Sequence, residues 1–306
     1  MTKSPLRRIV VLVNPRSGLQ WSFDAMRRAF DRHWECVDGV DMKYQFTQSQ
    51  ADGEQKARLC VADGVDTVIV VGGDGTLSTI GRILVDTDVA LGVVPAGSGN
   101  GFARHFGISL NPEKAIEQLA TARRQSIDVG HVNGRPFFVT CSMAWDASLV
   151  RGFDRMPVRG VLPYVFAGVE EFFDYRPQKM EVELDGEERM IFDNALVFTV
   201  ANLTQFGGGA RIAPHARADD GRLELVVALR QDIAKLVANI ARLFDGTLSE
   251  LPEVVFHSFK TMHMTREEGT AIQVDGELVE SGREIDVTVS EAGLRVLVPM
   301  DTPSRR

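Results

Sequence analysis

The feature that most constrains the fold of this chain is a repeated order of buried strand, glycine-rich turn and helix in its first half. The strand-like run Thr67 to Val71 stops at Gly72-Gly73-Asp74-Gly75, after which Thr76 to Val85 has helical spacing. Val89 to Val94 repeats the pattern and meets the turn Pro95 to Gly101. Continuous apolar strands that alternate with helices predict a parallel sheet with helices on both faces.

Two further segments extend this domain in both directions. Ile9 to Val13 is an apolar run that ends at the turn Asn14 to Gly18, and Trp21 to Trp34 has helical spacing. Asn111 and Pro112 provide the cap and the first-turn proline of another helix. Ligands of such sheets bind at the carboxyl ends of the strands, so both glycine-rich turns are predicted to lie at the binding edge.

Short strand-like segments and Asp-Gly turns dominate the second half of the chain and predict an antiparallel β-sandwich. Helices are expected only over Val161 to Tyr175 and over Asp232 to Phe244. We therefore expect an α/β domain over residues 1–128 and a β-sandwich over 129–306, whose last residues are expected to pack back on the first domain. The predicted strands are Lys179–Leu184, Ala195–Ala201, Leu223–Leu229, Val254–Met264, Ala271–Val274, Ile285–Val289 and Leu294–Val298.

Composition excludes several classes of protein. The formal charge of -8 and the pI near 5.4 argue against a nucleic-acid partner. The three cysteines, Cys36, Cys60 and Cys141, form no CxxC pair and are predicted to be reduced thiols in the cytosol. No apolar run is long enough to span a bilayer, and Met1 to Arg8 has no signal-peptide core. A cytoplasmic protein is expected, which would reach a lipid substrate only as a peripheral visitor.

The loop Gly72 to Thr76 has the composition of a phosphate-binding turn. Glycines let main-chain N–H groups converge on a phosphate, and the following helix N-terminus adds positive potential. Asp74 would repel phosphates unless Mg²⁺ lies between them or the carboxylate accepts other hydrogen bonds, so a metal-linked role is the simplest interpretation. The alternative is that Asp74 only caps the helix that follows. The dinucleotide, P-loop and protein-kinase motifs are absent from the sequence.

The second loop, Pro95 to Asn100, carries short polar side chains among its glycines. Ser98 and Asn100, with Arg104 one helical turn later, suit the polar edge and phosphate tail of a nucleotide. The alternative is a helix-capping loop without a ligand. Two such loops at one sheet edge favour the nucleotide.

An ordered series of motifs resembles the diacylglycerol kinase catalytic superfamily, which includes bacterial diacylglycerol and lipid kinases, sphingosine kinases and ceramide kinases. The series covers nearly the whole chain, and as a set it is specific. Its members are Asn14–Gly18, Thr47, Gly72–Thr76, Pro95–Asn100, Ile127-Asp128, Ala201-Asn202, Gly207–Gly209, Pro214, Asp220–Leu223 and Asp275-Gly276-Glu277.

This resemblance implies an N-terminal domain like that of NAD kinase and phosphofructokinase, a lipid-binding β-sandwich, and an active site in the cleft between them. Asp74 would hold the catalytic Mg²⁺ through water, and Asp275, or alternatively Glu277, would be the general base for the lipid hydroxyl. A structural Mg²⁺ would lie at Asp220 with the main-chain carbonyls of Arg217 and Arg222. The residues implied to contact ATP are Asn14, Pro15, Thr47, Gly72, Gly73, Asp74, Gly75, Thr76, Ser78, Ser98 and Asn100.

The sequence departs from the family pattern in three places. The family usually has Asn and Glu soon after its GGDGT motif, where this chain has Ser78 and Thr79. Leu19 stands where many bacterial members have Lys. Ser98 to Gly101 resembles sphingoid-base kinases as much as diacylglycerol kinases, so a sphingoid-base or ceramide acceptor is an alternative to the diacylglycerol-type acceptor that we favour.

Three hypotheses for function follow. The leading one is a lipid kinase of phospholipid biosynthesis that uses ATP and Mg²⁺. A second keeps the ATP loops but has a water-soluble acceptor, as in NAD kinases. A third is a nucleotide- or lipid-binding regulator without catalysis, which the departures at Ser78 and Thr79 make conceivable.

The lipid hypothesis predicts peripheral contact with the inner membrane surface. Arg151, Arg155 and Arg159 recur every four residues among apolar side chains and precede an aromatic stretch. Such a segment can lie on an anionic membrane and admit an acyl chain. The alternative is a solvated arginine face over a packed helix. The expected partners are a membrane lipid and no nucleic acid, and a homodimer is left open.

Overall fold

The computed structural model describes residues 7–18, 21–34, 39–145, 147 and 175–300, and divides the chain into two compact units. Unit 1 comprises Met1–Ile127 with Ala292–Arg306, and unit 2 comprises Asp128–Glu291. The predicted arginine series at Arg151, Arg155 and Arg159 lies outside the described residues, as does the predicted helix over 161–175 except for Tyr175.

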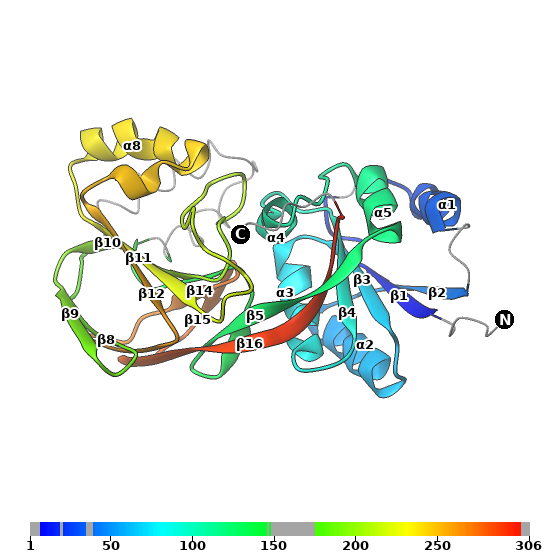
Figure 1. The fold of residues 1–306 in the computed structure, drawn as a ribbon, viewed down its shortest axis with the longest axis horizontal. Coiled ribbons are helices and arrows are strands. Elements are labelled where there is room, and N and C mark those ends of the chain that lie inside the picture. The colour runs from blue at the N-terminus through cyan, green and yellow to red at the C-terminus, as the bar shows by residue number, and fades with distance from the viewer. Residues whose placement is uncertain (1–6, 19–20, 35–38, 146, 148–174, 301–306) are drawn as a thin grey trace. The chain divides into compact units, whose positions relative to one another are not determined.

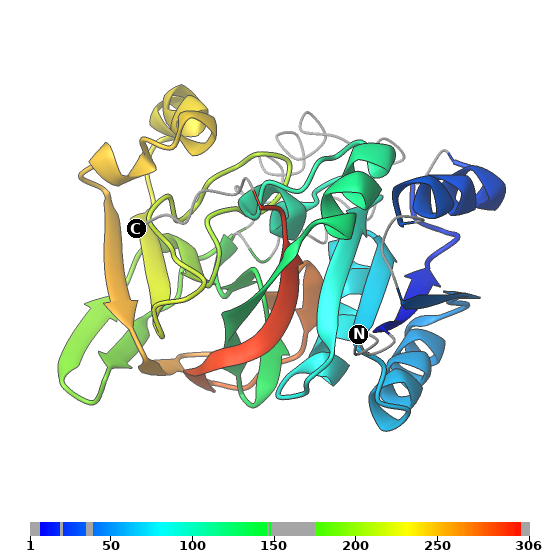
Figure 2. The ribbon, with the colours of Figure 1, turned by 45° about the vertical axis from the view of Figure 1, so that its right-hand side comes forward.

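Unit 1 contains a parallel sheet with helices on both faces, as the sequence predicts. Strands β2, β1, β3, β4 and the end of β16 are neighbours in this order. Helices α1 and α5 pack on one face, and α2 and α3 pack on the other (Figures 1 and 2). The elements are β1 (Arg7–Val13), α1 (Phe23–Trp34), β2 (Val40–Phe46), α2 (Gln50–Ala62), β3 (Thr67–Gly72), α3 (Asp74–Leu84), β4 (Ala90–Pro95), α4 (Gly101–His105), α5 (Pro112–Ala120), β5 (Arg123–Val132) and β16 (Glu284–Val298), of which β5 and β16 continue into unit 2.

Local sequence explains these elements. Strands β3 and β4 are buried along their whole length, which is why they read as continuous runs and not as alternating ones. Helix α5 begins where the sequence predicts, because the Asn111 side chain accepts a hydrogen bond from the Lys114 N–H and Pro112 occupies the first turn. The sheet therefore places the ends of β3 and β4 side by side.

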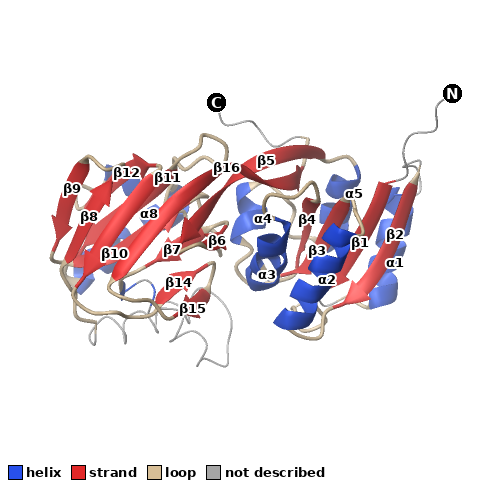
Figure 3. Cartoon of the chain, turned by 90° about the horizontal axis from the view of Figure 1, so that it is seen from below, coloured by secondary structure: helices blue, strands red, loops and turns tan. Residues whose placement is uncertain are grey.

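Unit 2 is a sandwich of two mainly antiparallel sheets. In one, β16, β13, β8 and β9 are neighbours, with β5 beside β16 and β6 beside β5; in the other the order is β12, β11, β10, β7, β14, β15. Figure 3 shows the hairpin β14–β15 beside β7. The strands are β6 (Arg135–Phe137), β7 (Thr140–Ser142), β8 (Met180–Leu184), β9 (Glu188–Phe192), β10 (Ala195–Ala201), β11 (Leu223–Leu229), β12 (Val254–Phe259), β13 (Thr261–Arg266), β14 (Ile272–Val274) and β15 (Glu277–Val279).

The main core of unit 2 lies between its two sheets. Val182 and Met264 from the first sheet pack in one apolar cluster with Phe198 and Leu225 from the second. Helix α8 (Ile233–Asp245) and the 3-10 turn η1 (Leu248–Glu250) cover the outer face of the second sheet in a smaller cluster (Figure 1). Inward-facing apolar residues from two sheets are the pattern that defines a sandwich.

Two expectations about strands were wrong in their boundaries. The single strand predicted over Val254–Met264 is two strands, β12 and β13, which pair in different sheets on either side of Lys260. Conversely, the two strands predicted over Ile285–Val289 and Leu294–Val298 are one long strand, β16. Among the residues that the structure describes, no helix is long and apolar enough to cross a membrane.

Candidate active site

The two glycine-rich loops of unit 1 lie against each other at one edge of the sheet. Gly72 and Pro95 are paired in the β3–β4 register, and the Ala96 N–H donates to the Gly72 carbonyl at 2.9 Å. A Cβ added to Gly97 would lie 2.7 Å from the Cα of Gly73, a distance that real Cβ atoms essentially never show. Only glycine allows this approach, so Gly73 and Gly97 have a packing reason that is independent of any ligand.

Asp74 connects the two loops. It is the first residue of α3, but Gly73 is the cap position of that helix and no side chain caps it. The Asp74 carboxylate instead accepts the N–H groups of Gly101 and Phe102 at 3.2 and 3.4 Å, so it caps α4 from a distant part of the chain. Asp74 therefore does not cap its own helix, and that alternative interpretation of the sequence was wrong.

Burial gives this carboxylate an unfavourable environment for its charge. Desolvation raises the pKa of Asp74 above its usual range, while the N–H groups of Gly101 and Phe102 and the charge of Arg104 act in the opposite direction. Arg104 is itself held to the second loop, because its Nε donates to the Gly99 carbonyl at 3.1 Å. A carboxylate of this kind would be stabilised by a bound cation.

Asn14 contacts the first loop, and Thr47 contacts the end of the strand that precedes Asn14. The Asn14 Nδ2 donates to the Thr76 Oγ1 at 2.8 Å, and the Asn14 N–H donates to the Val71 carbonyl. Thr47 is buried, with its hydroxyl and its N–H both directed to the Val13 carbonyl at 3.4 and 2.8 Å. Asn14 thus ties the first turn of the chain to the start of α3. Pro15 beside it is exposed.

The other predicted nucleotide contacts differ in exposure. Ser98 is exposed at the tip of its loop, whereas Ser78 is buried in α3. Asn100 has a left-handed backbone (φ 51°), and its side chain makes two hydrogen bonds to the main chain of Gly97, at 3.0 and 2.7 Å. Gly75 is exposed, and a Cβ added to it would meet no atom within 4 Å. The main chain at Gly75 therefore faces open space, while Asn100 shapes its own loop.

Asp275 is a buried carboxylate at the tip of the β14–β15 hairpin in unit 2. The Asp275-Gly276 turn has positive φ at both residues (49° and 86°), as expected for a two-residue hairpin turn. The carboxylate accepts the N–H groups of Phe138, Val139 and Thr140, at 2.9, 2.8 and 3.3 Å. These donors stabilise its negative charge and fix its position.

Glu277, two residues beyond, forms an ion pair. The Arg135 Nη2 lies 2.5 Å from the Glu277 Oε2, and both side chains are partly exposed. Nearby, the Asn202 Nδ2 donates to the carbonyls of Asp128 and Phe138, at 2.8 and 3.0 Å. Phe138 is thus held at its N–H by Asp275 and at its carbonyl by Asn202.

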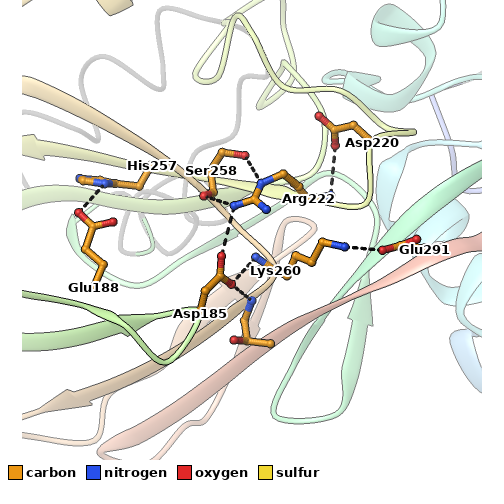
Figure 4. Close-up of polar contacts among 9 residues, drawn as sticks. Asp185, Glu188, Asp220, Arg222, His257, Ser258, Lys260 and Glu291 are labelled. Carbon is orange, nitrogen blue, oxygen red and sulfur yellow. Dashed lines mark hydrogen bonds and ion pairs between the residues drawn. The ribbon is translucent and has the colours of Figure 1, made fainter.

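The predicted structural metal site lies at the start of β11. The Asp220 carboxylate accepts the Arg222 N–H at 3.1 Å, and the Arg222 side chain bonds Ser258 and Asp185 (Figure 4). Burial, together with the charges of Asp128 and Asp219, raises the pKa of Asp220.

Glu224, four residues further along, also has its pKa raised by burial and by Asp220. Within the described part of the chain, no group of three or more His, Cys, Asp or Glu side chains is arranged to hold a metal. The predicted set combines one carboxylate with the main-chain carbonyls of Arg217 and Arg222, and it stays a prediction.

Sequence reasoning missed several participants. Arg135, Gly101 and the main chain of residues 138–140 contact the predicted acids across long sequence separations, and their residue types give no local signal.

Comparison with protein families gives matches along nearly the whole chain. Residues 8–132 match the model of the diacylglycerol kinase catalytic domain. Residues 140–298 match the model of the YegS C-terminal NAD kinase beta sandwich-like domain.

Individual proteins of similar length also match. A diacylglycerol kinase of Mycobacterium tuberculosis (strain H37Rv) is 30% identical over 306 residues, covering 98% of this chain and 97% of that protein. A probable lipid kinase, YegS-like, of Pseudomonas fluorescens is 29% identical over 87% of this chain and 88% of its own length. A solved putative diacylglycerol kinase of Bacillus anthracis shares the fold with a TM-score of 0.80 at 18% identity, covering 97% of this chain and 99% of that one.

Proposed function

This chain belongs to the diacylglycerol kinase catalytic-domain superfamily and is a lipid kinase, and from that premise we propose that it transfers the γ-phosphate of Mg-ATP to the hydroxyl of a diacylglycerol-type lipid. One observation carries the nucleotide part of the proposal. Two glycine-rich loops meet at the carboxyl edge of a parallel sheet, and the main chain of Gly75 faces open space at the start of α3.

The residues of unit 1 fit a bound nucleotide. The first N–H groups of α3 have no partner within the helix, and their dipole favours a phosphate there. The hydrogen bond from Asn14 to Thr76 would hold the start of this helix in place. Mg²⁺, when bound, would neutralise phosphate charge, and the desolvated carboxylate of Asp74 has the chemistry to hold it through water.

The residues of unit 2 would serve the lipid. Phosphoryl transfer needs a group that accepts the proton of the lipid hydroxyl, and we assign this to Asp275, with Glu277 as the alternative. The three main-chain N–H groups fix the position of the Asp275 carboxylate. Arg135 neutralises Glu277, which favours Asp275 for this role.

The diacylglycerol-type acceptor is favoured because the similar mycobacterial protein is named a diacylglycerol kinase. A sphingoid-base or ceramide acceptor, a soluble acceptor and a non-catalytic regulator are the competing proposals. A lipid acceptor also requires peripheral contact with the membrane that contains it.

Transfer of labelled γ-phosphate from Mg-ATP to a panel of micellar lipids tests the proposal. The panel contains diacylglycerol, sphingosine, ceramide, monoacylglycerol and phosphatidylglycerol. Labelling of diacylglycerol above the others is expected. Labelling of sphingosine or ceramide instead would move the acceptor to the sphingoid class. No labelling of any lipid, with ATP still bound, would favour the soluble acceptor or the regulator.

Gly75→Ala is expected to weaken ATP binding by at least about tenfold without lowering stability, since a methyl group there meets only a ligand. Isothermal titration with Mg-ATP and thermal unfolding measure the two effects. Gly97→Ala is the contrast, because its Cβ would collide with Gly73 and cost about 1–3 kcal/mol of unfolding free energy. Unchanged ATP affinity in Gly75→Ala would place the phosphates elsewhere.

Asp220→Asn should remove a stabilisation by Mg²⁺ that is independent of nucleotide. A cation at ten times its dissociation constant adds about 1.4 kcal/mol to the free energy of unfolding. Thermal unfolding with Mg²⁺ or with a chelator measures this in the wild type and the variant. Asp219→Asn is the matched control, since the neighbouring carboxylate binds only the Arg217 side chain in the hydrogen bonds seen. An equal Mg²⁺ effect in all three proteins would rule out a metal ion at Asp220.

A further inference from the structure

Arg266, the last residue of β13, has an unusual environment for an arginine. The residue is only 1% exposed, and its side chain is among the largest fully buried ones in the described part of the chain. Among the residues that the structure describes, no carboxylate forms an ion pair with it. Burial without a counter-charge is costly for a guanidinium and lowers its pKa. A buried cation of this kind requires other acceptors.

Those acceptors come from one small region. The guanidinium makes five hydrogen bonds to Thr270, Ser281 and Gly282. The Nη1 donates to the Thr270 Oγ1 at 2.9 Å and the Nη2 to the Thr270 carbonyl at 2.5 Å. The Nε and Nη2 both donate to the Gly282 carbonyl, at 3.1 and 2.9 Å. The rigid planar fork of arginine suits this convergence, which a lysine cannot reproduce.

These acceptors mark the open end of the β14–β15 hairpin. Thr270 lies two residues before β14, and Ser281 and Gly282 follow β15. A main-chain hydrogen bond also joins the two residues that flank the hairpin, since the Arg266 N–H donates to the Arg283 carbonyl at 2.9 Å. Gly269 packs so closely that a Cβ on it would lie 2.9 Å from the Ser281 carbonyl oxygen. The guanidinium therefore joins the two legs of the hairpin at its base.

The tip of the same hairpin carries both acids that we assign to the lipid side. Three residue pairs separate base from tip, with Ile272 opposite Val279 and Val274 opposite Glu277. At about 3.4 Å per residue, the hairpin is about 10 Å long. A hairpin this short is not stable alone, so its geometry depends on its neighbours. Strand β14 pairs with β7 along one side, which leaves the tip and the base of the hairpin to be fixed by other contacts. Asp275 fixes the tip to residues 138–140, and Arg266 fixes the base.

We propose that Arg266 is a positioning residue for phosphoryl transfer, which holds the β14–β15 hairpin so that Asp275 and Glu277 keep their places. This inference rests on the proposed function of those two acids. Arg266 acts through the hairpin and contacts neither ATP nor lipid in the proposal. Its loss moves the acids, and a displacement of about 1 Å can cost about 10²-fold in rate.

Arg266→Ala tests the inference in the full-length chain. We expect kcat for lipid phosphorylation to fall by about 10²-fold, with the KM for ATP within about twofold of wild type. Hydrogen exchange of the amides in 270–282 should accelerate more than that of β10 and β11. Guanidinium at low millimolar concentration should restore part of kcat, because it can fill the vacated site. Arg266→Lys should retain the charge but recover little activity.

Two further variants keep the test decisive. Arg189→Ala is the control, because Arg189 is an exposed arginine that pairs only with Glu183 in the contacts seen, and guanidinium should have no effect on it. Gly269→Ala leaves Arg266 in place but pushes the two legs of the hairpin apart, so it should lower kcat in the same way. This second variant decides the question if Arg266→Ala does not fold.

The outcomes separate this inference from the proposed function. A folded Arg266→Ala with wild-type kcat would overturn the inference, as would a loss of activity with uniformly faster exchange and no rescue by guanidinium. If the wild-type protein phosphorylates no lipid, the proposed function fails. In that case, hydrogen exchange of Arg266→Ala that accelerates only in residues 270–282 still supports Arg266 as the residue that holds the hairpin. Hydrogen exchange that accelerates equally along the chain refutes it.

Discussion

Asp275→Asn is expected to lower the rate of phosphoryl transfer to lipid by about 10³-fold and to leave ATP binding unchanged. Asparagine keeps the shape of the side chain but cannot accept the proton of the lipid hydroxyl. The proposed ATP contacts all belong to unit 1, whereas Asp275 belongs to unit 2. Single-turnover transfer of labelled phosphate and titration with Mg-ATP measure the two quantities.

The same substitution should also lower stability, and the structure says why. The carboxylate accepts three main-chain N–H groups with its two oxygens. An amide has only one oxygen, so its NH₂ group would face at least one of these donors. Hydrogen bonds to a charged group contribute about 1.5–3 kcal/mol, and we expect a loss of about 2 kcal/mol in the free energy of unfolding. Thermal or urea unfolding measures it.

A second Asp-Gly turn provides the matched control. Asp185 and Gly186 also have positive φ, at 52° and 75°, and the Asp185 carboxylate accepts the N–H groups of Lys260 and Thr261. Asp185→Asn should therefore lower stability without affecting transfer. If both variants lose stability and both retain transfer, Asp275 is an anchor of the hairpin alone, and Glu277→Gln becomes the next test for the base.

Much of unit 1 could be predicted because its chemistry is local. The strands β3 and β4 are buried on both faces, and each ends at a loop whose glycines stand out in the sequence. Parallel neighbours then bring the loops together without further information. The family motifs likewise follow the order of the chain, which is why the family and the lipid kinase activity were identified from the sequence.

The elements that sequence reasoning missed lack such a pattern. Strand β2 is half-exposed along most of its length and mixes polar with apolar residues, so it shows neither a continuous run nor a strict alternation. Helix α2 contains Gly53 within its first turns and has a weakly segregated apolar face. Its cap at Ser49 is a local signal that could have identified it, since the side chain accepts the Asp52 N–H.

The contacts that define the candidate site were beyond local reasoning. Asp74 meets Gly101, and Asp275 meets Val139, across sequence separations that no periodicity links. In each case the carboxylate binds main-chain N–H groups, whose positions are independent of residue type. The sequence identified the acids, and only the fold shows what anchors them.

Asp74→Asn should reduce phosphoryl transfer by about 10³-fold and abolish the tightening of ATP binding by Mg²⁺. The amide oxygen is a weaker ligand for a hard cation than a carboxylate and carries no charge to compensate it. ATP titration with and without Mg²⁺ measures the change. Asp66→Asn is the control, because that carboxylate accepts the Arg8 N–H at the opposite end of β3 and should leave ATP binding intact.

Without ligand, the same substitution should change the stability of the protein in a way that depends on pH. Since burial raises the pKa of Asp74, the folded chain binds more protons than the unfolded chain between the ordinary value of 3.8 and the raised value. Stability contributed by this group is therefore lost as pH rises through that window. Without ligand, Asp74→Asn should equal or exceed the wild type in stability above the window, and this advantage should shrink as pH falls.

Mg-ATP should make the wild type more stable than the variant, because the bound cation stabilises the charged Asp74 carboxylate and the variant has no carboxylate at that position. Thermal unfolding of the wild type and the variant across this pH range, with and without Mg-ATP, measures these differences in stability. A variant that is less stable than the wild type at every pH would show that the hydrogen bonds to Gly101 and Phe102 outweigh desolvation. Equal stabilisation of both proteins by Mg-ATP would show that Asp74 anchors α4 and does not hold the cation.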